Sequence, residues 1–203
     1  MLIKNFLTIS NDGKGIPYGG DGTQRPDGDA NFGFKNVKGD PAGCALIPEL
    51  ARDHALARLV LAVNDASTGL FSVGCVSGEV ADKSGFRWSG YMEFALNSKS
   101  LISNASNYFP IFFHFAYGTP DEAESFDAEF HWALMGARFA ETNSEGFTCV
   151  LTMNTYYRPT KEEALTLWGQ ALGVLESYLS TVQEDFGDPI YAAQTRTEGS
   201  KTI

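Results

Sequence analysis

Two stretches of the chain each hold a pair of strand-like segments joined by a short polar turn. In the first stretch residues 70–80 precede the turn and residues 86–96 follow it. In the second stretch residues 126–141 and 147–158 have the same arrangement. Two apolar segments separated by a few turn residues are typical of a β-hairpin. The pattern therefore predicts two hairpins, and with them a mostly antiparallel sheet.

Two further segments carry strand-like patterns outside these hairpins. Residues 2–9 alternate loosely between apolar and polar side chains, which is typical of a strand with one buried face. Residues 108–117 form a very apolar run, and Pro110 lies near its start, where a strand tolerates proline. Together with the two hairpins, these segments predict a sheet of about five or six strands.

Two segments carry the signals of helices. The first begins at Pro48, a residue that suits the first turn of a helix, and extends to about Asn64. The second follows Thr160, which forms a capping box with Glu163. Apolar residues recur along it at helical spacing and predict one buried face: Ala164, Trp168, Ala171, Leu175, Tyr178 and Val182. We expect these two main helices to pack on the sheet, so the predicted fold class is α+β.

The size and the aromatic content of the chain indicate one domain with a large core. The chain has 203 residues, among them 15 Phe, 8 Tyr and 3 Trp, and so many rings need a buried interior. A chain of this length suits one domain better than two. We therefore expect a single domain over residues 1–203, in which the polar residues 195–203 form a frayed tail.

Residues 10–43 differ in composition from the rest of the chain, because Gly, Asp, Asn and Pro dominate them. Such a segment predicts a long loop, and long loops inside domains are usually functional or mobile. Within it Asp27, Asp29 and Asn31 place side-chain oxygens at alternate positions, as calcium-binding loops do. However, Phe32 stands where such a loop has its glycine. These three residues are a candidate metal site, and a turn-rich surface loop is the alternative.

The charge of the chain excludes some classes of partner. The formal net charge is −10 at pH 7, and the sequence holds no run of Lys or Arg. Binding to nucleic-acid phosphates or to an anionic membrane requires a basic surface. We therefore expect an acidic, soluble protein that binds neither nucleic acid nor membrane. An acidic face that meets a basic partner is the more specific interpretation of the same charge.

The cysteines indicate the cellular compartment of the protein, and the motifs of the sequence limit the chemistry that it can carry out. Cys44, Cys75 and Cys149 are widely spaced and form no CxxC pair, so we expect free buried thiols in a reducing compartment. The first residues do not resemble a secretory signal, and a cytoplasmic location is expected. The sequence lacks a phosphate-binding loop, a Gly-x-Ser-x-Gly motif and a His-Glu-x-x-His motif, so no cofactor is predicted.

The histidines are the remaining candidates for catalytic chemistry. If residues 108–117 and 126–141 form neighbouring antiparallel strands, the imidazoles of His114 and His131 fall close to the same level. Glu129 shares a strand face with His131, because alternate residues of a strand do, and Tyr157 can lie opposite on the next strand. Such a group could form an acid–base pair or a metal site. Structural roles for both histidines are the alternative.

These observations leave two functions open. The first is a non-enzymatic interaction protein that binds another protein, or a second copy of itself, through a sheet face or the glycine-rich loop. The acidic charge, the aromatic content and the lack of a catalytic motif favour it. The second is a small-molecule enzyme, either metal-dependent or metal-free, that uses a cleft around His114 and His131.

Overall fold

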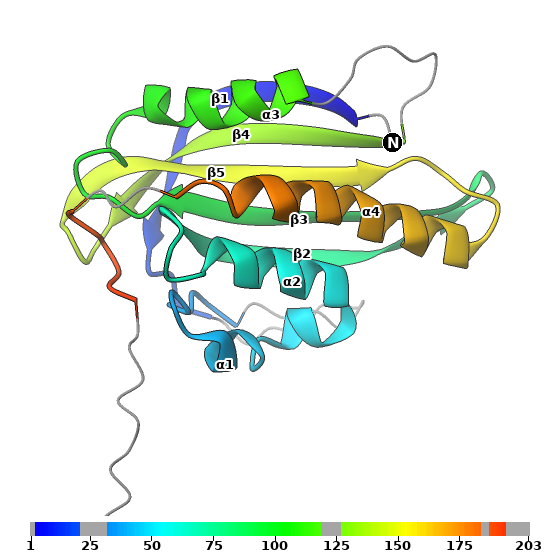
Figure 1. The fold of residues 1–203 in the computed structure, drawn as a ribbon, viewed down its shortest axis with the longest axis horizontal. Helices are drawn as coiled ribbons and strands as arrows, with labels where there is room; N and C mark the ends of the chain where they lie inside the picture. The colour runs from blue at the N-terminus through cyan, green and yellow to red at the C-terminus, as the bar shows by residue number, and fades with distance from the viewer. Residues whose placement is uncertain (1–2, 21–31, 119–126, 184–186, 194–203) are drawn as a thin grey trace, which may run out of the picture.

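The computed structural model describes residues 3–20, 32–118, 127–183 and 187–193. Its centre is a five-stranded sheet with the strand order β1-β4-β5-β3-β2 (Figure 1). The strands are β1 (Ile3–Ile16), β2 (Leu70–Asp82), β3 (Gly85–Leu96), β4 (Ala128–Phe139) and β5 (Ser144–Thr155). Strand β1 pairs with β4 in parallel, whereas every other neighbouring pair is antiparallel. The mostly antiparallel sheet and both predicted hairpins, β2–β3 and β4–β5, are confirmed.

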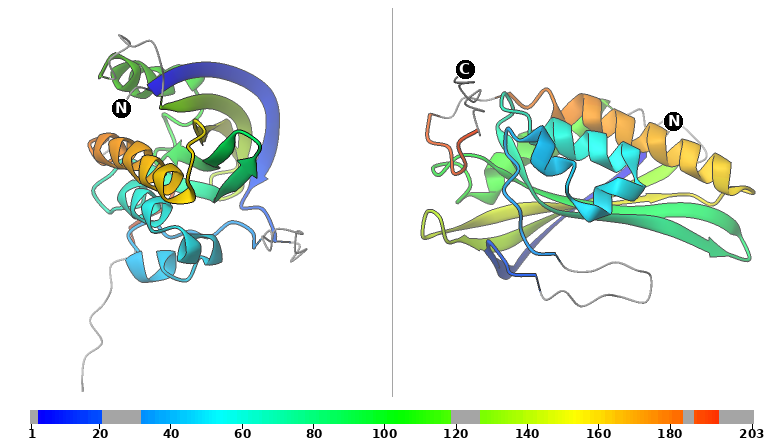
Figure 2. Two further views of the ribbon diagram at one scale, coloured as in Figure 1. Left: turned by 90° about the vertical axis from the view of Figure 1, so that its right-hand side faces the viewer. Right: turned by 90° about the horizontal axis from the view of Figure 1, so that it is seen from below.

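The helices pack on one face of this sheet. They are α1 (Pro41–Cys44), α2 (His54–Val63), α3 (Phe109–Gly118) and α4 (Lys161–Leu179), with short 3₁₀ helices η1 (Pro48–Arg52) and η2 (Ala105–Tyr108). Figure 2 shows the sheet curling around α2, α3 and α4, which lie on its concave side. The two main helices on a mostly antiparallel sheet give the predicted α+β fold. Within the described residues, no helix is both long enough and apolar enough to cross a membrane.

The main core lies between the concave side of the sheet and the helices. Strand residues Phe94, Trp132 and Leu151 face Leu56 of α2 and Leu175 of α4, and each of these side chains is at most 1% exposed. A second, smaller cluster lies on the other side of the sheet, at one end. Its buried members are Ile16, Phe71, Val73, Ala95, Ile102, Ala137, Phe139 and Tyr191. Burial of apolar area in these two clusters stabilises the domain.

The predicted first helix, residues 48–64, is interrupted at Asp53. Residues 48–52 form η1, and α2 begins only at His54. The backbone of Asp53 is extended, with φ −135° and ψ 94°, and its side chain accepts hydrogen bonds from the backbone N–H groups of Ala55 and Leu56. An aspartate in this conformation is a strong N-cap, so it starts a new helix in place of continuing the old one.

The prediction of a strand over residues 108–117 is wrong, because most of this segment is helix α3. Ile111 and Phe115, which are four residues apart, are its buried side chains, as expected for one face of a helix. Pro110 lies in the first turn of the helix, where its missing N–H breaks no hydrogen bond. A run that is apolar on all sides has no periodicity to separate a strand from a helix.

The predicted loop of residues 10–43 begins too early. Strand β1 continues to Ile16, and residues 10 and 13–16 remain paired with β4 across an irregularity between Ser10 and Gly13. At its other end α1 begins at Pro41. Parallel pairing with a central strand overrides the weak strand propensity of glycine and asparagine here. The predicted tail at residues 195–203 lies outside the described residues.

The carboxylate of Asp53 joins three elements. Besides capping α2, its Oδ2 atom accepts hydrogen bonds from Ser77 Oγ of β2 and from Trp168 Nε1 of α4, both at 2.6 Å. Asp53 is only 6% exposed, and Trp168 is fully buried. A buried carboxylate is tolerated where hydrogen bonds replace its hydration, and here the backbone and two side chains supply them.

We predict that Leu175→Ala lowers the free energy of unfolding by about 2–5 kcal/mol, because truncation of a buried leucine leaves a cavity. Leu175 is fully buried on the face of α4 that packs against the sheet. Urea denaturation followed by circular dichroism measures the change, and Leu165→Ala on the exposed face of α4 is the control. An unchanged midpoint and slope for Leu175→Ala would exclude this side chain from the core.

We predict that Asp53→Asn destabilises the fold by about 2–3 kcal/mol, because an amide cannot accept all four hydrogen bonds and leaves a buried donor unpaired. In a Trp168→Phe background, which removes the indole N–H, the same change should cost at least about 1 kcal/mol less. A double-mutant cycle by urea denaturation measures this coupling. Equal costs in both backgrounds contradict a link between α2 and α4 through Asp53.

Candidate functional site

The side of the sheet that faces away from the helices carries a row of side chains across all five strands. Neighbouring positions in this row are Phe6, His131, Thr152, Tyr91 and Val76, in the order β1, β4, β5, β3 and β2. They point away from the helices, because their sequence neighbours, such as Trp132 and Met92, are in the main core. The next row, Thr8, Ala133, Val150, Glu93 and Gly74, lies beside it. We call these two rows the convex face.

The convex face is exposed on strands β1 and β4 and half-buried toward β2. Phe6 is 41% exposed, His131 is exposed, and Thr152, Tyr91 and Val150 are half-buried. Helices α2, α3 and α4 pack on the opposite side of the sheet (Figure 2). An antiparallel sheet can have one face in solvent, but that face is then usually polar. Here aromatic and aliphatic side chains are mixed with Thr and His, and such a surface is suited to contact with another molecule.

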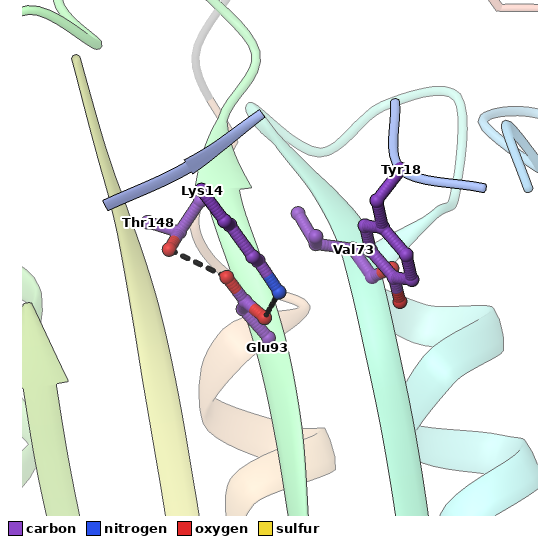
Figure 3. A network of polar contacts seen from close by, with 5 residues as sticks. All are labelled: Lys14, Tyr18, Val73, Glu93 and Thr148. Atoms are coloured by element: carbon purple, nitrogen blue, oxygen red, sulfur yellow. Dashed lines mark hydrogen bonds and ion pairs between the residues drawn. The ribbon is translucent and has the colours of Figure 1, made fainter. Parts of the chain in front are cut away.

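A buried glutamate lies within the convex face. Glu93 is 2% exposed, and its Oε1 atom accepts a hydrogen bond of 2.6 Å from Thr148 Oγ1. Its Oε2 atom forms an ion pair with the ammonium group of Lys14, whose side chain is 41% exposed. Figure 3 shows Lys14 extending toward Glu93, with Thr148 on the other side of the carboxylate. Lys14 neutralises the charge of this buried carboxylate, and Thr148 supplies a hydrogen bond in place of water.

Tyr18 lies next to this ion pair (Figure 3). The ammonium group of Lys14 is 4.7 Å from the centre of the Tyr18 ring, which is cation–π geometry. The Tyr18 hydroxyl donates a hydrogen bond of 3.1 Å to the backbone oxygen of Val73, at the irregularity of β2 between Ser72 and Gly74. Burial, and then the neighbouring Tyr91 and Glu93, raise the pKa of Tyr18 to about 12.

A cavity of about 220 Å³ opens beside Tyr18 at the β2 edge of the convex face, and Gly74, Val76 and Tyr91 line it. Gly74 is required for this arrangement. A Cβ atom at position 74 would lie 2.8 Å from the Tyr18 hydroxyl oxygen and 3.8 Å from that of Tyr91. A glycine in a strand commonly marks a bulge or a close approach of another group, and both are present here.

The two candidate histidines do not come together. His114 is exposed on α3, a helix whose Phe115 contacts Phe130 and Trp132 on the concave side of the sheet. His131 lies between these two residues in β4, so its imidazole points to the convex side. There its Nε2 atom is 3.0 Å from Thr8 Oγ1. The sheet therefore separates the two imidazoles, because the strand that was predicted to carry His114 is a helix.

The other candidates have separate partners. The Tyr157 hydroxyl donates to Asp82 at 2.6 Å, whereas Glu129 accepts from Tyr156 at 2.6 Å. These hydrogen bonds raise the pKa values of the two tyrosines. The candidate calcium ligands, Asp27, Asp29 and Asn31, lie outside the described residues. Within the part of the chain that the structure describes, no three His, Cys, Asp or Glu side chains form a group that could hold a metal ion.

Two residues of the site, Lys14 and Glu93, were not among the sequence candidates. Glu93 carries a signal, because it stands between Met92 and Phe94 in residues 91–96, which are otherwise apolar. A carboxylate on such a strand is rarely fully buried unless it is paired. Its cation could not be found from the sequence, since Lys14 is far away along the chain, in a segment that was predicted to be a loop.

No protein-family model, no curated protein and no solved structure matches this chain. The geometry of the convex face and the composition of the chain are therefore the basis for assigning a function.

We predict that Tyr18 makes the stability of the protein fall at high pH. An unfolded tyrosine ionises near pH 10, whereas the pKa of Tyr18 in the folded protein is about 12. The stabilisation is therefore complete below pH 10 and is lost as the pH rises through 12, with about 1 kcal/mol lost by pH 11. Urea denaturation of the wild type and of Tyr18→Phe at pH 9 and pH 11 isolates this contribution. Identical pH dependence in both proteins contradicts the assignment.

Proposed function

We propose that this protein is a non-enzymatic binding protein and that its convex face is the docking surface for a partner protein. The observation that carries this proposal is the row of Phe6, His131, Thr152, Tyr91 and Val76, which lies on the side of the sheet opposite to α2, α3 and α4. A contiguous exposed surface that contains aromatic and aliphatic side chains is a common mark of a protein–protein contact site.

The composition of the convex face supports a protein partner. Aromatic side chains are enriched in protein interfaces, and the centre of an interface is poor in charged residues. The convex face fits this description, since the one carboxylate in its two rows, Glu93, is buried and paired with Lys14. A sheet also supplies a rigid platform, so that little conformational entropy is lost when a partner binds.

The charge of the chain supports a basic partner. With a formal net charge of −10, the protein attracts a positively charged surface and increases its rate of association. The same charge disfavours nucleic acids and anionic membranes as partners. We place this interaction in the cytoplasm, where Cys44, Cys75 and Cys149 remain free thiols, as they are in the structure.

The alternative of a small-molecule enzyme receives no support from the histidines. A general acid–base pair requires groups within hydrogen-bonding reach of one substrate. His114 and His131 lie on opposite sides of the sheet, and Tyr157 is hydrogen-bonded to Asp82. These positions offer no common cleft for a substrate, so the binding function is the one we pursue.

The test compares two arginine substitutions of the same residue type. Thr152 is half-buried at the centre of the convex face, whereas Thr166 is exposed on α4, on the other side of the sheet. We expect Thr152→Arg to remove a partner that the wild type captures under quantitative affinity purification, because a large charge disrupts a desolvated centre. Thr166→Arg should retain the partner.

Folding of both variants is checked by thermal denaturation, so that loss of binding is not confused with loss of structure. Retention of the same partners by a folded Thr152→Arg protein would contradict the convex face as the docking surface. Loss of the partners from Thr166→Arg alone would place the interaction on the helical side.

A further inference from the structure

The cavity beside Tyr18 has the size of a single side chain. Its volume is about 220 Å³, whereas pockets for drug-sized ligands typically measure about 300–1,000 Å³. It opens where β2 borders the convex face, and Tyr91 and Val76 belong both to its lining and to that face. A partner that docks on the convex face would therefore meet the opening of this cavity.

The walls of the cavity combine aromatic rings with carboxylate charge. Tyr18 and Tyr91 supply the rings, and Glu49 of η1 supplies a half-buried carboxylate. No hydrogen bond or ion pair joins the Glu49 carboxylate to another residue in the described ranges. Glu49 is close enough to act on its neighbours, since its charge contributes to the raised pKa values of Tyr18 and Cys75.

Two lysines also line the cavity, and neither cancels the charge of Glu49. The ammonium group of Lys14 is already paired with Glu93, so that this pair is close to neutral. Lys35 also lines the cavity and is exposed to solvent, where its charge is screened. Among the described residues, the Glu49 carboxylate in the cavity wall thus has no paired cation.

The contacts of Lys14 are an example of how a cation is bound next to this cavity. Its ammonium group binds a carboxylate oxygen of Glu93 and at the same time lies over the ring of Tyr18. A carboxylate and an aromatic face each attract a cation. Glu49, Tyr18 and Tyr91 line the same cavity and offer the same two kinds of group, and no described lysine is paired with Glu49.

We propose that this cavity binds an arginine side chain of the partner, with the guanidinium group beside the Glu49 carboxylate and against the tyrosine rings. Arginine fits better than lysine, because its planar guanidinium stacks on aromatic rings and is more weakly hydrated than an ammonium group. The inference rests on the proposed function for its partner, and it specifies that partner as a basic protein with an exposed arginine. The cavity itself can be tested without the partner.

The test uses blocked arginine, N-acetyl-arginine-methylamide, as the probe in a titration followed by ¹⁵N–¹H correlation spectra. Blocked citrulline, which has nearly the same shape but no charge, is the matched control, and sodium acetate tests for an anion site. We expect saturable shifts at the amides of Gly74, Val76 and Tyr91 with the arginine probe and none with the citrulline probe. Equal shifts with citrulline, shifts with acetate only, or no shifts at all would overturn the proposal.

Two variants test separately how the charge and the shape of the cavity contribute to binding of the arginine probe. Glu49→Gln keeps the shape of the cavity and should weaken binding of the arginine probe about tenfold, because a charge-assisted hydrogen bond is lost. Gly74→Ala adds a methyl group between the two tyrosine hydroxyls and should also weaken it. Glu162→Gln, an equal charge change at an exposed position of α4, should leave the affinity unchanged. Unaltered affinity in both Glu49→Gln and a folded Gly74→Ala protein would exclude this cavity as the site.

The two proposals fail in different ways. If Thr152→Arg loses the partner but the arginine probe does not bind, the convex face remains a docking surface and the cavity is not its anchor point. If the probe binds but Thr152→Arg retains every partner, the cavity is a cation site that serves another surface.

Discussion

The helical layer of this protein depends on the buried carboxylate of Asp53. It starts α2, and it holds Trp168 of α4 and Ser77 of β2 within hydrogen-bonding distance of one acceptor. Burial of a carboxylate in an apolar interior destabilises the fold unless its hydrogen bonds are made, so these bonds favour one relative geometry of α2, α4 and β2. Apolar contacts between α4 and the sheet are less directional and would tolerate a small displacement of the helix. The position of the two main helices on the concave side therefore follows from a polar contact as much as from the core.

The packing of the helices on the concave side of the sheet explains why the candidate site lies on the convex side. Once α2, α3 and α4 cover one face, alternate strand residues point outward on the other, and Tyr91, Val150 and Glu93 are among them. Glu93 is compatible with this position because Lys14 reaches it from the far edge strand, β1. The pair therefore links the edge strand β1 to β3 across β4 and β5. The glycine at position 74 then leaves the space in which Tyr18 and the cavity lie.

Much of the fold could be predicted from the sequence, whereas little of the site could. Hairpins β2–β3 and β4–β5 and helix α4 have strong local signals: turn residues between apolar segments and the capping box of Thr160 and Glu163. The sequence predicts a strand where helix α3 lies, because residues 109–115 are apolar at every position except His114 and so show no helical period, whereas in the structure Phe115 packs on Trp132 as part of one helix face. The histidine hypothesis failed with that assignment. The contacts of Lys14 with Glu93 and of Tyr18 with Val73 join residues that are far apart in the chain, and no local pattern encodes them.

The parallel pairing of β1 with β4 also determines the order in which the strands of the sheet can pair. Ile3 pairs with Ala128 and Ile16 with Phe139, so the neighbour of β1 in the sheet comes more than a hundred residues later in the chain. Strands β2 and β3 form a local hairpin and can pair as soon as both are synthesised, whereas β1 must wait with its backbone groups unpaired. The ion pair of Lys14 with Glu93 lies between β1 and the rest of the sheet, so it too depends on this long-range pairing. Until β4 is available, β1 is the strand of the described sheet most exposed to incorrect strand pairing.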